Sequence, residues 1–133
     1  MNQVMQHAEN IRITLHVLPN ALVAWADGRL DEHERSLIER IAEDARGPSK
    51  REPHGTRGPW LDRAPSQAEV ETWVRLVRAF LRRVPSAARE RFVAQTKENL
   101  WLVARVSGAP ASVCPNERAV IARIEQILHT VAA

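Results

Sequence analysis

The chain has 133 residues, of which 44% are apolar and 26% charged, and its formal net charge is +3. This composition excludes a disordered or collagen-like chain, and the length suits a single domain with one apolar core. A single cysteine, Cys114, excludes an internal disulfide. Residues 1–10 lack the basic and apolar regions of a signal peptide, and His16, Pro19 and Asn20 interrupt the longest apolar stretch. We therefore expect a soluble cytoplasmic protein without a transmembrane segment.

The first third of the chain has helical periodicity. A first helix is expected up to Pro19, where the proline ring would end or kink it. A short apolar helix from Asn20 to Asp27 then ends at Gly28, because glycine readily adopts the left-handed conformation after a helix. Asp31 is expected to cap the next helix, with a glutamate three residues later in capping-box register. The apolar face of the first helix comprises Val4, Ala8, Ile11, Leu15 and Leu18.

Residues 46–65 have no apolar periodicity, and repeated glycine and proline residues interrupt them. Between Arg46 and Arg63 there are five basic and two acidic residues, so this segment carries the whole net charge. We expect a long, irregular basic loop here, exposed between Gly47 and Arg57 and anchored to the core by Trp60 or Leu61.

Three further helices follow the loop. Ser66 and Glu69 predict a capping box ahead of a helix that runs to Pro85. Ser86 is expected to cap the next helix, and Pro115 occupies the favoured first position of the last one. No segment alternates with period two, so we find no convincing strand. The sequence therefore predicts an all-α helical bundle of five to seven helices, with residues 1–133 forming one domain.

Two segments of the chain correspond to each other. Each has an apolar helix, a glycine and then an amphipathic helix that starts near a glutamate. The spacing suggests an insertion at residues 109–112 and two helix pairs related by a pseudo-twofold axis. The matched residues are Leu22, Val23, Ala24, Gly28, Glu34, Arg35, Ile38, Arg40 and Ile41 in the first copy, and Leu102, Val103, Ala104, Gly108, Glu117, Arg118, Ile121, Arg123 and Ile124 in the second.

The segment AWADGRLDEHE from Ala24 to Glu34, followed by an isoleucine-rich helix and a degenerate second copy, resembles the TerB-like family. The namesake of that family belongs to bacterial tellurite-resistance systems. The resemblance implies a pseudo-symmetric helical bundle, acidic positions that bind a divalent metal, usually calcium, and work with protein partners in stress-response complexes at or near the membrane. In the second copy, Ser107 occupies the position of Asp27, and Cys114 occupies the position of Asp31. The second copy therefore lacks two of the three carboxylates of the first.

Asp27, Asp31 and Glu34 are the candidate metal ligands. They match the later acidic positions of a calcium-binding EF-hand loop. Val23 and Trp25 fall where that loop needs oxygen ligands, which excludes a standard EF-hand and predicts weak binding of calcium or another divalent metal. The same acidic residues also suit a purely structural role in ending one helix and capping the next.

We expect a non-catalytic interaction module, because no phosphate-binding loop, nucleophile elbow or zinc-ligand spacing is present. Cys114 has no neighbouring histidine, and His16 is expected to be an interior group.

Two alternatives remain open. Arg75, Arg78 and Arg82 share one helical face and, with the basic loop, could bind an anion or nucleic acid. Nucleic acid is not the expected partner, because no aromatic residues alternate with these arginines. The second alternative is an enzyme whose catalytic residues converge only in the fold.

Overall fold

Helices make up the fold in the part of the chain that a computed structural model describes, namely residues 2–26, 28, 30–46, 60–106 and 115–132. Side chains are described from residue 11 to 45, 60 to 105 and 115 to 131 within these ranges. The helices are α1 (Asn2–Ala24), α2 (Glu32–Arg46), α3 (Gln67–Arg83), α4 (Ser86–Val106) and α5 (Pro115–Ala132). The described ranges contain no strand, which confirms the all-α prediction. None of the described helices has the length and hydropathy needed to cross a bilayer.

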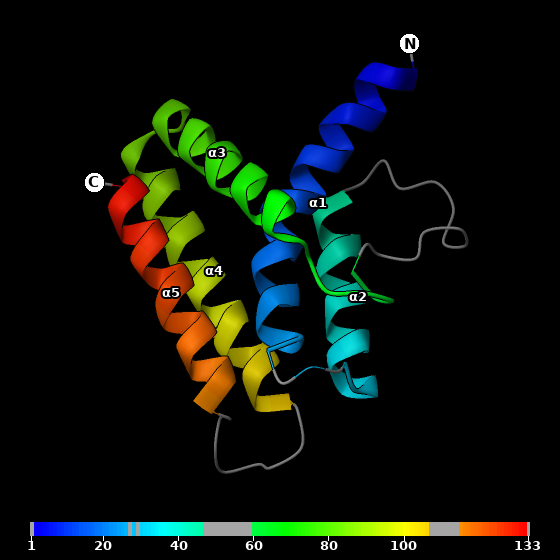
Figure 1. The fold of residues 1–133 in the computed structure, drawn as a ribbon. Coiled ribbons are helices and arrows are strands. Elements are labelled where there is room, and N and C mark those ends of the chain that lie inside the picture. The colour runs from blue at the N-terminus through cyan, green and yellow to red at the C-terminus, as the bar shows by residue number, and fades with distance from the viewer. Residues whose placement is uncertain (1, 27, 29, 47–59, 107–114, 133) are drawn as a thin grey trace.

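The central helix is α1, which contacts each of the other four (Figure 1). α2 lies beside α1, α4 and α5 lie side by side, and α3 crosses one end of the bundle (Figure 1). This position explains why residues 17–21 of α1 are all buried, whatever their polarity. Each of the other helices contributes one apolar face to the core, which includes Leu18, Ala21, Val23, Ile38, Trp73, Val77, Leu81, Leu100, Val103, Ile121, Ile124 and Leu128.

The prediction that Pro19 separates two helices is wrong, because α1 continues through Pro19 to Ala24. Proline lacks the N–H that would bond to the carbonyl four residues earlier, so Leu15 O loses its helical donor. The indole of Trp73 on α3 donates to that carbonyl at 3.2 Å. The Asn20 side-chain amide donates to His16 O, the next carbonyl, at 2.7 Å. These two donors satisfy the carbonyls around the proline, and the helix continues.

Gly28 follows the end of α1, as expected. Its φ is +95°, in the region that favours glycine, and its N–H donates to Trp25 O at 2.9 Å. The last turn of α2 receives a donor from α1, since Arg12 Nε lies 3.2 Å from Ala45 O. A cation at this point stabilises the carbonyl end of α2.

Residues 60–66 anchor the end of the predicted loop to the bundle. Trp60 and Leu61 are both buried, which confirms the expected anchor. Trp60 O accepts a hydrogen bond from Trp25 Nε1 at 2.8 Å, and Leu61 O accepts one from Arg35 Nη2 at 3.0 Å. The segment is therefore attached to both α1 and α2. The predicted exposure of Gly47–Arg57 lies outside the described residues.

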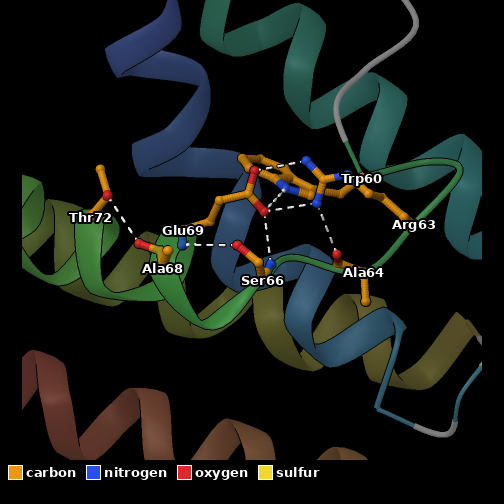
Figure 2. Close-up of polar contacts among 7 residues, drawn as sticks. All are labelled: Trp60, Arg63, Ala64, Ser66, Ala68, Glu69 and Thr72. Atoms are coloured by element: carbon orange, nitrogen blue, oxygen red, sulfur yellow. Dashed lines mark hydrogen bonds and ion pairs between the residues drawn. The ribbon is translucent and has the colours of Figure 1, made fainter.

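The predicted capping box at the start of α3 is confirmed. Ser66 Oγ accepts from Glu69 N at 3.2 Å, and Glu69 Oε1 accepts from Ser66 N at 2.8 Å. Figure 2 shows that Trp60 and Arg63 also reach the Glu69 carboxylate. Trp60 has a φ of +68°, a left-handed conformation that is rare for a bulky residue. Glu69 therefore holds together the cap and the strained segment before it.

The predicted start of α4 is wrong by one residue, and the predicted start of α5 is confirmed. Ser86 is the first residue of α4 rather than its cap, and the Pro85 carbonyl accepts the Arg89 N–H at 2.9 Å. Proline already has the φ that suits a helix start, so the cap falls one residue earlier than predicted. Pro115 is the first residue of α5, as predicted.

Candidate functional site

A buried polar cluster among the described residues includes the cap of α2. Asp31 Oδ1 accepts from Glu34 N at 2.8 Å, and Glu34 Oε1 accepts from Asp31 N at 3.0 Å. The predicted capping box between Asp31 and Glu34 is therefore confirmed, and it fixes the position of the Glu34 side chain. Asp27, the other predicted metal ligand, lies outside the described residues.

Glu34 does not point to solvent, as the first turn of a surface helix would suggest. Its exposure is 1%, and that of Glu117 on α5 is 0%. The Glu117 side chain lies opposite the Glu34 carboxyl, close enough for a proton to join them. Each glutamate is the third residue of its helix, and both helices begin at the same end of the bundle (Figure 1). The fold thus brings together two carboxyl groups that are far apart in the sequence.

Electrostatics at this pair favour a bound proton. The pKa of Glu34 is raised to about 8. Burial is the largest cause, and the charges of Asp31 and Glu117 and the contact with the Glu117 side chain act in the same direction, whereas a hydrogen bond from the Asp31 backbone lowers the pKa. Glu34 Oε2 is buried and has no hydrogen-bond partner among the described residues. Two facing carboxylates both accept hydrogen bonds, so a donor or a cation is needed between them.

Carboxylate oxygens bind protons and hard divalent cations. The pair can therefore hold one shared proton, or it can contribute two ligands to a cation. No group of three or more His, Cys, Asp or Glu side chains suited to a metal occurs within the described residues. Any further ligands of a cation would have to be backbone carbonyls, water or a residue outside that part of the chain, such as Asp27.

The arginine face that the sequence singled out lies elsewhere. Arg75, Arg78 and Arg82 are all exposed on α3, whereas the glutamate pair joins α2 and α5. Arg75 Nη2 lies 3.4 Å from Thr72 Oγ1 on its own helix. The structure therefore does not bring the arginines and the acidic residues into one site.

Glu117 is a residue of this pair that the sequence pattern does not predict as a site residue. It was matched to Glu34 in the repeat, but only as an element of the pattern. A signal was present, because a glutamate at the same place in two similar helices points to a shared position in the fold.

The sequence analysis also considered His16 and Cys114 as individual residues. His16 is half-buried and packs edge-on against Phe92, with ring centres 5.5 Å apart, as expected of an interior group. Cys114 lies outside the described residues.

Comparisons of the chain with protein-family models, with curated proteins and with solved structures found no match. The resemblance to the TerB-like family therefore rests on the residues of the sequence, and the glutamate pair has to be interpreted from its own chemistry.

Proposed function

We propose that the protein is a non-catalytic, TerB-like interaction module of a bacterial stress-response system, in which Glu34 and Glu117 form the centre of a weak divalent-cation site. One observation carries this proposal. Glu34 Oε2 is buried without a hydrogen-bond partner among the described residues, and it belongs to a carboxyl group opposite a second one. A cation between the two groups would satisfy that oxygen and neutralise the repulsion.

The proposed internal repeat explains why these two glutamates lie close together. Glu34 and Glu117 are matched positions of the two segments, and each is the third residue of its helix. Residues near a pseudo-twofold axis meet their own counterparts, as the residues of a symmetric dimer do. The meeting of these two glutamates supports the pseudo-twofold arrangement, and with it the resemblance to the TerB-like family.

In this proposal Asp31 has a positioning role, because its cap holds Glu34 in place. Asp27 is the proposed third carboxylate, and calcium is the proposed ion. Calcium takes six to eight oxygens, so a site with so few carboxylates should bind it weakly, with a dissociation constant of about 10⁻⁴ to 10⁻³ M. The proton and the cation compete for the same oxygens, so binding should strengthen above the raised pKa of Glu34.

Thermal unfolding with calcium tests the proposal. At pH 8.5, 10 mM calcium should raise the melting temperature by about 4 °C, as expected for a ligand that binds the native state with a dissociation constant near 1 mM. At pH 6 the shift should be much smaller, because the pair then holds its proton. Glu34→Gln and Glu117→Gln should each abolish the calcium response and keep the shape of the side chain.

Glu43→Gln is the matched control, since Glu43 is an exposed residue of the same helix. It should leave the calcium response unchanged. An equal response in all four proteins, or no response to calcium, magnesium or manganese at pH 8.5, would leave the pair as a proton-sharing structural contact.

Anion binding is the second candidate function. Arg78 and Arg82 are exposed and make no hydrogen bond or ion pair with the described residues, so both guanidinium groups are available. An acidic peptide labelled with a fluorophore should then bind with a steep salt dependence. The Arg75, Arg78 and Arg82 triple glutamine variant should lose that binding, and a salt-independent anisotropy signal would count against it.

A further inference from the structure

An open groove of about 470 Å³ runs along the amino-terminal half of α4. No other described helix contributes a side chain to it, so a face of α4 is left without a partner there. The spacings of three and four between the lining residues place them on one side of the helix. These residues are Ser86, Arg89, Glu90, Val93, Ala94 and Lys97.

The middle of this groove can accept another helix. Val93 is half-buried and packs against the core, and Ala94 is exposed. Both side chains are short, so a second helix can approach the α4 backbone closely at this point. Arg89 borders the groove, and its Nε donates to Leu81 O at 3.1 Å, which holds this long side chain in place. The groove therefore has an apolar centre and a fixed border.

Two opposite charges on the same face have no partner within the described part of the chain. Glu90 is exposed and Lys97 is half-buried, and neither makes a hydrogen bond or ion pair with the described residues. The two residues are almost two helical turns apart, which separates their backbones by about 10 Å along the axis. Each charge is therefore available to a group from outside the chain.

The two charges are placed symmetrically about the apolar centre. Glu90 precedes Val93 by three residues, and Lys97 follows Ala94 by three residues. When two copies of one helix pack antiparallel about a twofold axis, each residue meets the position equally far beyond the axis. With the axis between Val93 and Ala94, Glu90 of each copy faces Lys97 of the other.

We propose that this face of α4 docks on the same face of a second copy of the chain, in an antiparallel homodimer with two Glu90–Lys97 ion pairs. A second copy satisfies both charges, whereas a uniformly acidic or basic partner would repel one of them. A parallel pair of helices would place like charges opposite each other. The contact is independent of the glutamate pair, which lies on α2 and α5, and of the proposed function.

Sedimentation velocity tests the dimer. A contact of one helix with one helix is at the small end of interface sizes, so the native chain should dimerise with a dissociation constant on the order of 100 µM. Glu90→Lys and Lys97→Glu should each weaken the dimer at least about tenfold, because like charges then face each other in both contacts. Glu43→Lys is the matched control, since Glu43 is exposed on α2, and it should dimerise as the native chain does.

A mixture of the two charge-reversed variants tests the register. In the mixed dimer the two substituted positions face each other with opposite charges, and the native Lys97 of one chain faces the native Glu90 of the other. Glu90→Lys and Lys97→Glu should therefore associate with each other although neither dimerises alone. Unchanged circular dichroism of each variant would show that both are folded.

A cysteine beside the axis gives a second measurement. In a Cys114→Ser background, Ala94→Cys should form a disulfide-linked dimer on mild oxidation, because residue 94 of each copy lies next to its own counterpart. Ala119→Cys, at an exposed position of α5, should not. The proposal fails if the native chain stays monomeric up to about 1 mM, well above the expected dissociation constant. It fails equally if either charge reversal dimerises as the native chain does, if the mixed variants do not associate, or if the two cysteine variants cross-link alike. A native monomer would leave the groove to a helix of a different protein.

Discussion

The indole of Trp73 replaces the donor that Pro19 removes from α1. Trp73 is fully buried, and its Nε1 donates to Leu15 O at 3.2 Å. We predict that Trp73→Phe lowers the free energy of unfolding by at least about 1–3 kcal/mol, because the carbonyl is then buried without a donor. Loss of side-chain volume adds a cavity contribution. Urea denaturation would measure the change.

A Pro19→Ala background distinguishes the loss of the Trp73 hydrogen bond from the cavity that Trp73→Phe creates. Alanine supplies a backbone N–H that can donate to Leu15 O, so Trp73→Phe should cost less in the Pro19→Ala background than in the native chain. Trp101→Phe is the comparison, because its indole donates to Glu125 Oε2 instead of a backbone carbonyl. Its cost should be the same in both backgrounds. If the cost of Trp73→Phe is also unaffected by Pro19→Ala, the indole does not replace the proline donor.

The buried pair makes stability depend on pH. Burial first, and the nearby carboxylates next, raise the pKa of Glu34 from 4.5 to about 8. Between these values the folded protein holds a proton that the unfolded chain lacks. The free energy of unfolding should therefore fall as pH rises through this interval, by up to about 1.4 kcal/mol per pH unit. Urea denaturation at pH 5.5, 7 and 8.5 in the absence of divalent metal would measure the slope.

Glu34→Gln should flatten this profile, because the amide is uncharged at every pH in the range. The exposed Glu43→Gln should keep the native slope. A native protein whose stability rises or stays level from pH 5.5 to 8.5 would contradict the shared proton.

The sequence could predict the capping box of this site, but it could not predict the contact between the two glutamates. Capping depends on residues three apart, so the Asp31–Glu34 box was evident from spacing alone. The meeting of Glu34 with Glu117 depends on the tertiary arrangement of the bundle, which brings the first turns of α2 and α5 near each other. Spacing along the chain carries no such information, although the repeat matched the two positions.

At the scale of elements, the start of α3 depends on one carboxylate. Arg63 donates to Glu69 through Nη1 at 2.9 Å and through Nη2 at 2.8 Å, and this contact is the main cause that lowers the pKa of Glu69. The pair is nevertheless exposed, so we expect its contribution to stability to be small. The hydrogen bonds from Ser66 N and Trp60 Nε1 should be the more important contacts.

Two substitutions of Glu69 distinguish these contributions. Glu69→Gln keeps a carbonyl oxygen for Ser66 N and Trp60 Nε1 and loses the ion pair, so it should change stability little. Glu69→Ala loses the cap as well and should cost about 1 kcal/mol or more. Thermal melts at low and high salt would compare them, and the small effect of Glu69→Gln should shrink further in high salt. Equal losses in the two variants would assign the stabilisation to the ion pair.

Most helix boundaries followed from caps and periodicity, because both act within one or two turns. Ser66, Asp31, Gly28 and Pro115 each mark a boundary where the sequence predicted one. Pro19 is the exception, since its outcome depends on Trp73, which comes from a distant part of the chain. A proline in a helical pattern predicts a break only when no tertiary donor replaces its missing N–H.

At the scale of the whole molecule, the glutamate pair is a contact between the two halves of the proposed repeat. α2 belongs to the first half and α5 to the second, and the pair joins their amino-terminal turns. The sequence predicted an all-α bundle, but the central position of α1 and the packing of the helices around it are tertiary properties. A test of coupling between the halves is therefore a test of the packing itself.

A double-mutant cycle on the pair measures that coupling. At pH 8.5, Glu34→Gln and Glu117→Gln should each raise the free energy of unfolding, because one amide can donate to the remaining carboxylate and ends the repulsion. The double variant should gain little beyond either single variant, since one neutral partner is enough. The effects should therefore deviate from additivity by about 0.5–3 kcal/mol. Glu34→Gln combined with Glu43→Gln is the control and should be additive within about 0.5 kcal/mol. If the Glu34 and Glu117 effects were additive to the same degree, the two carboxyl groups would not interact, and the contact between the two halves would have to lie elsewhere.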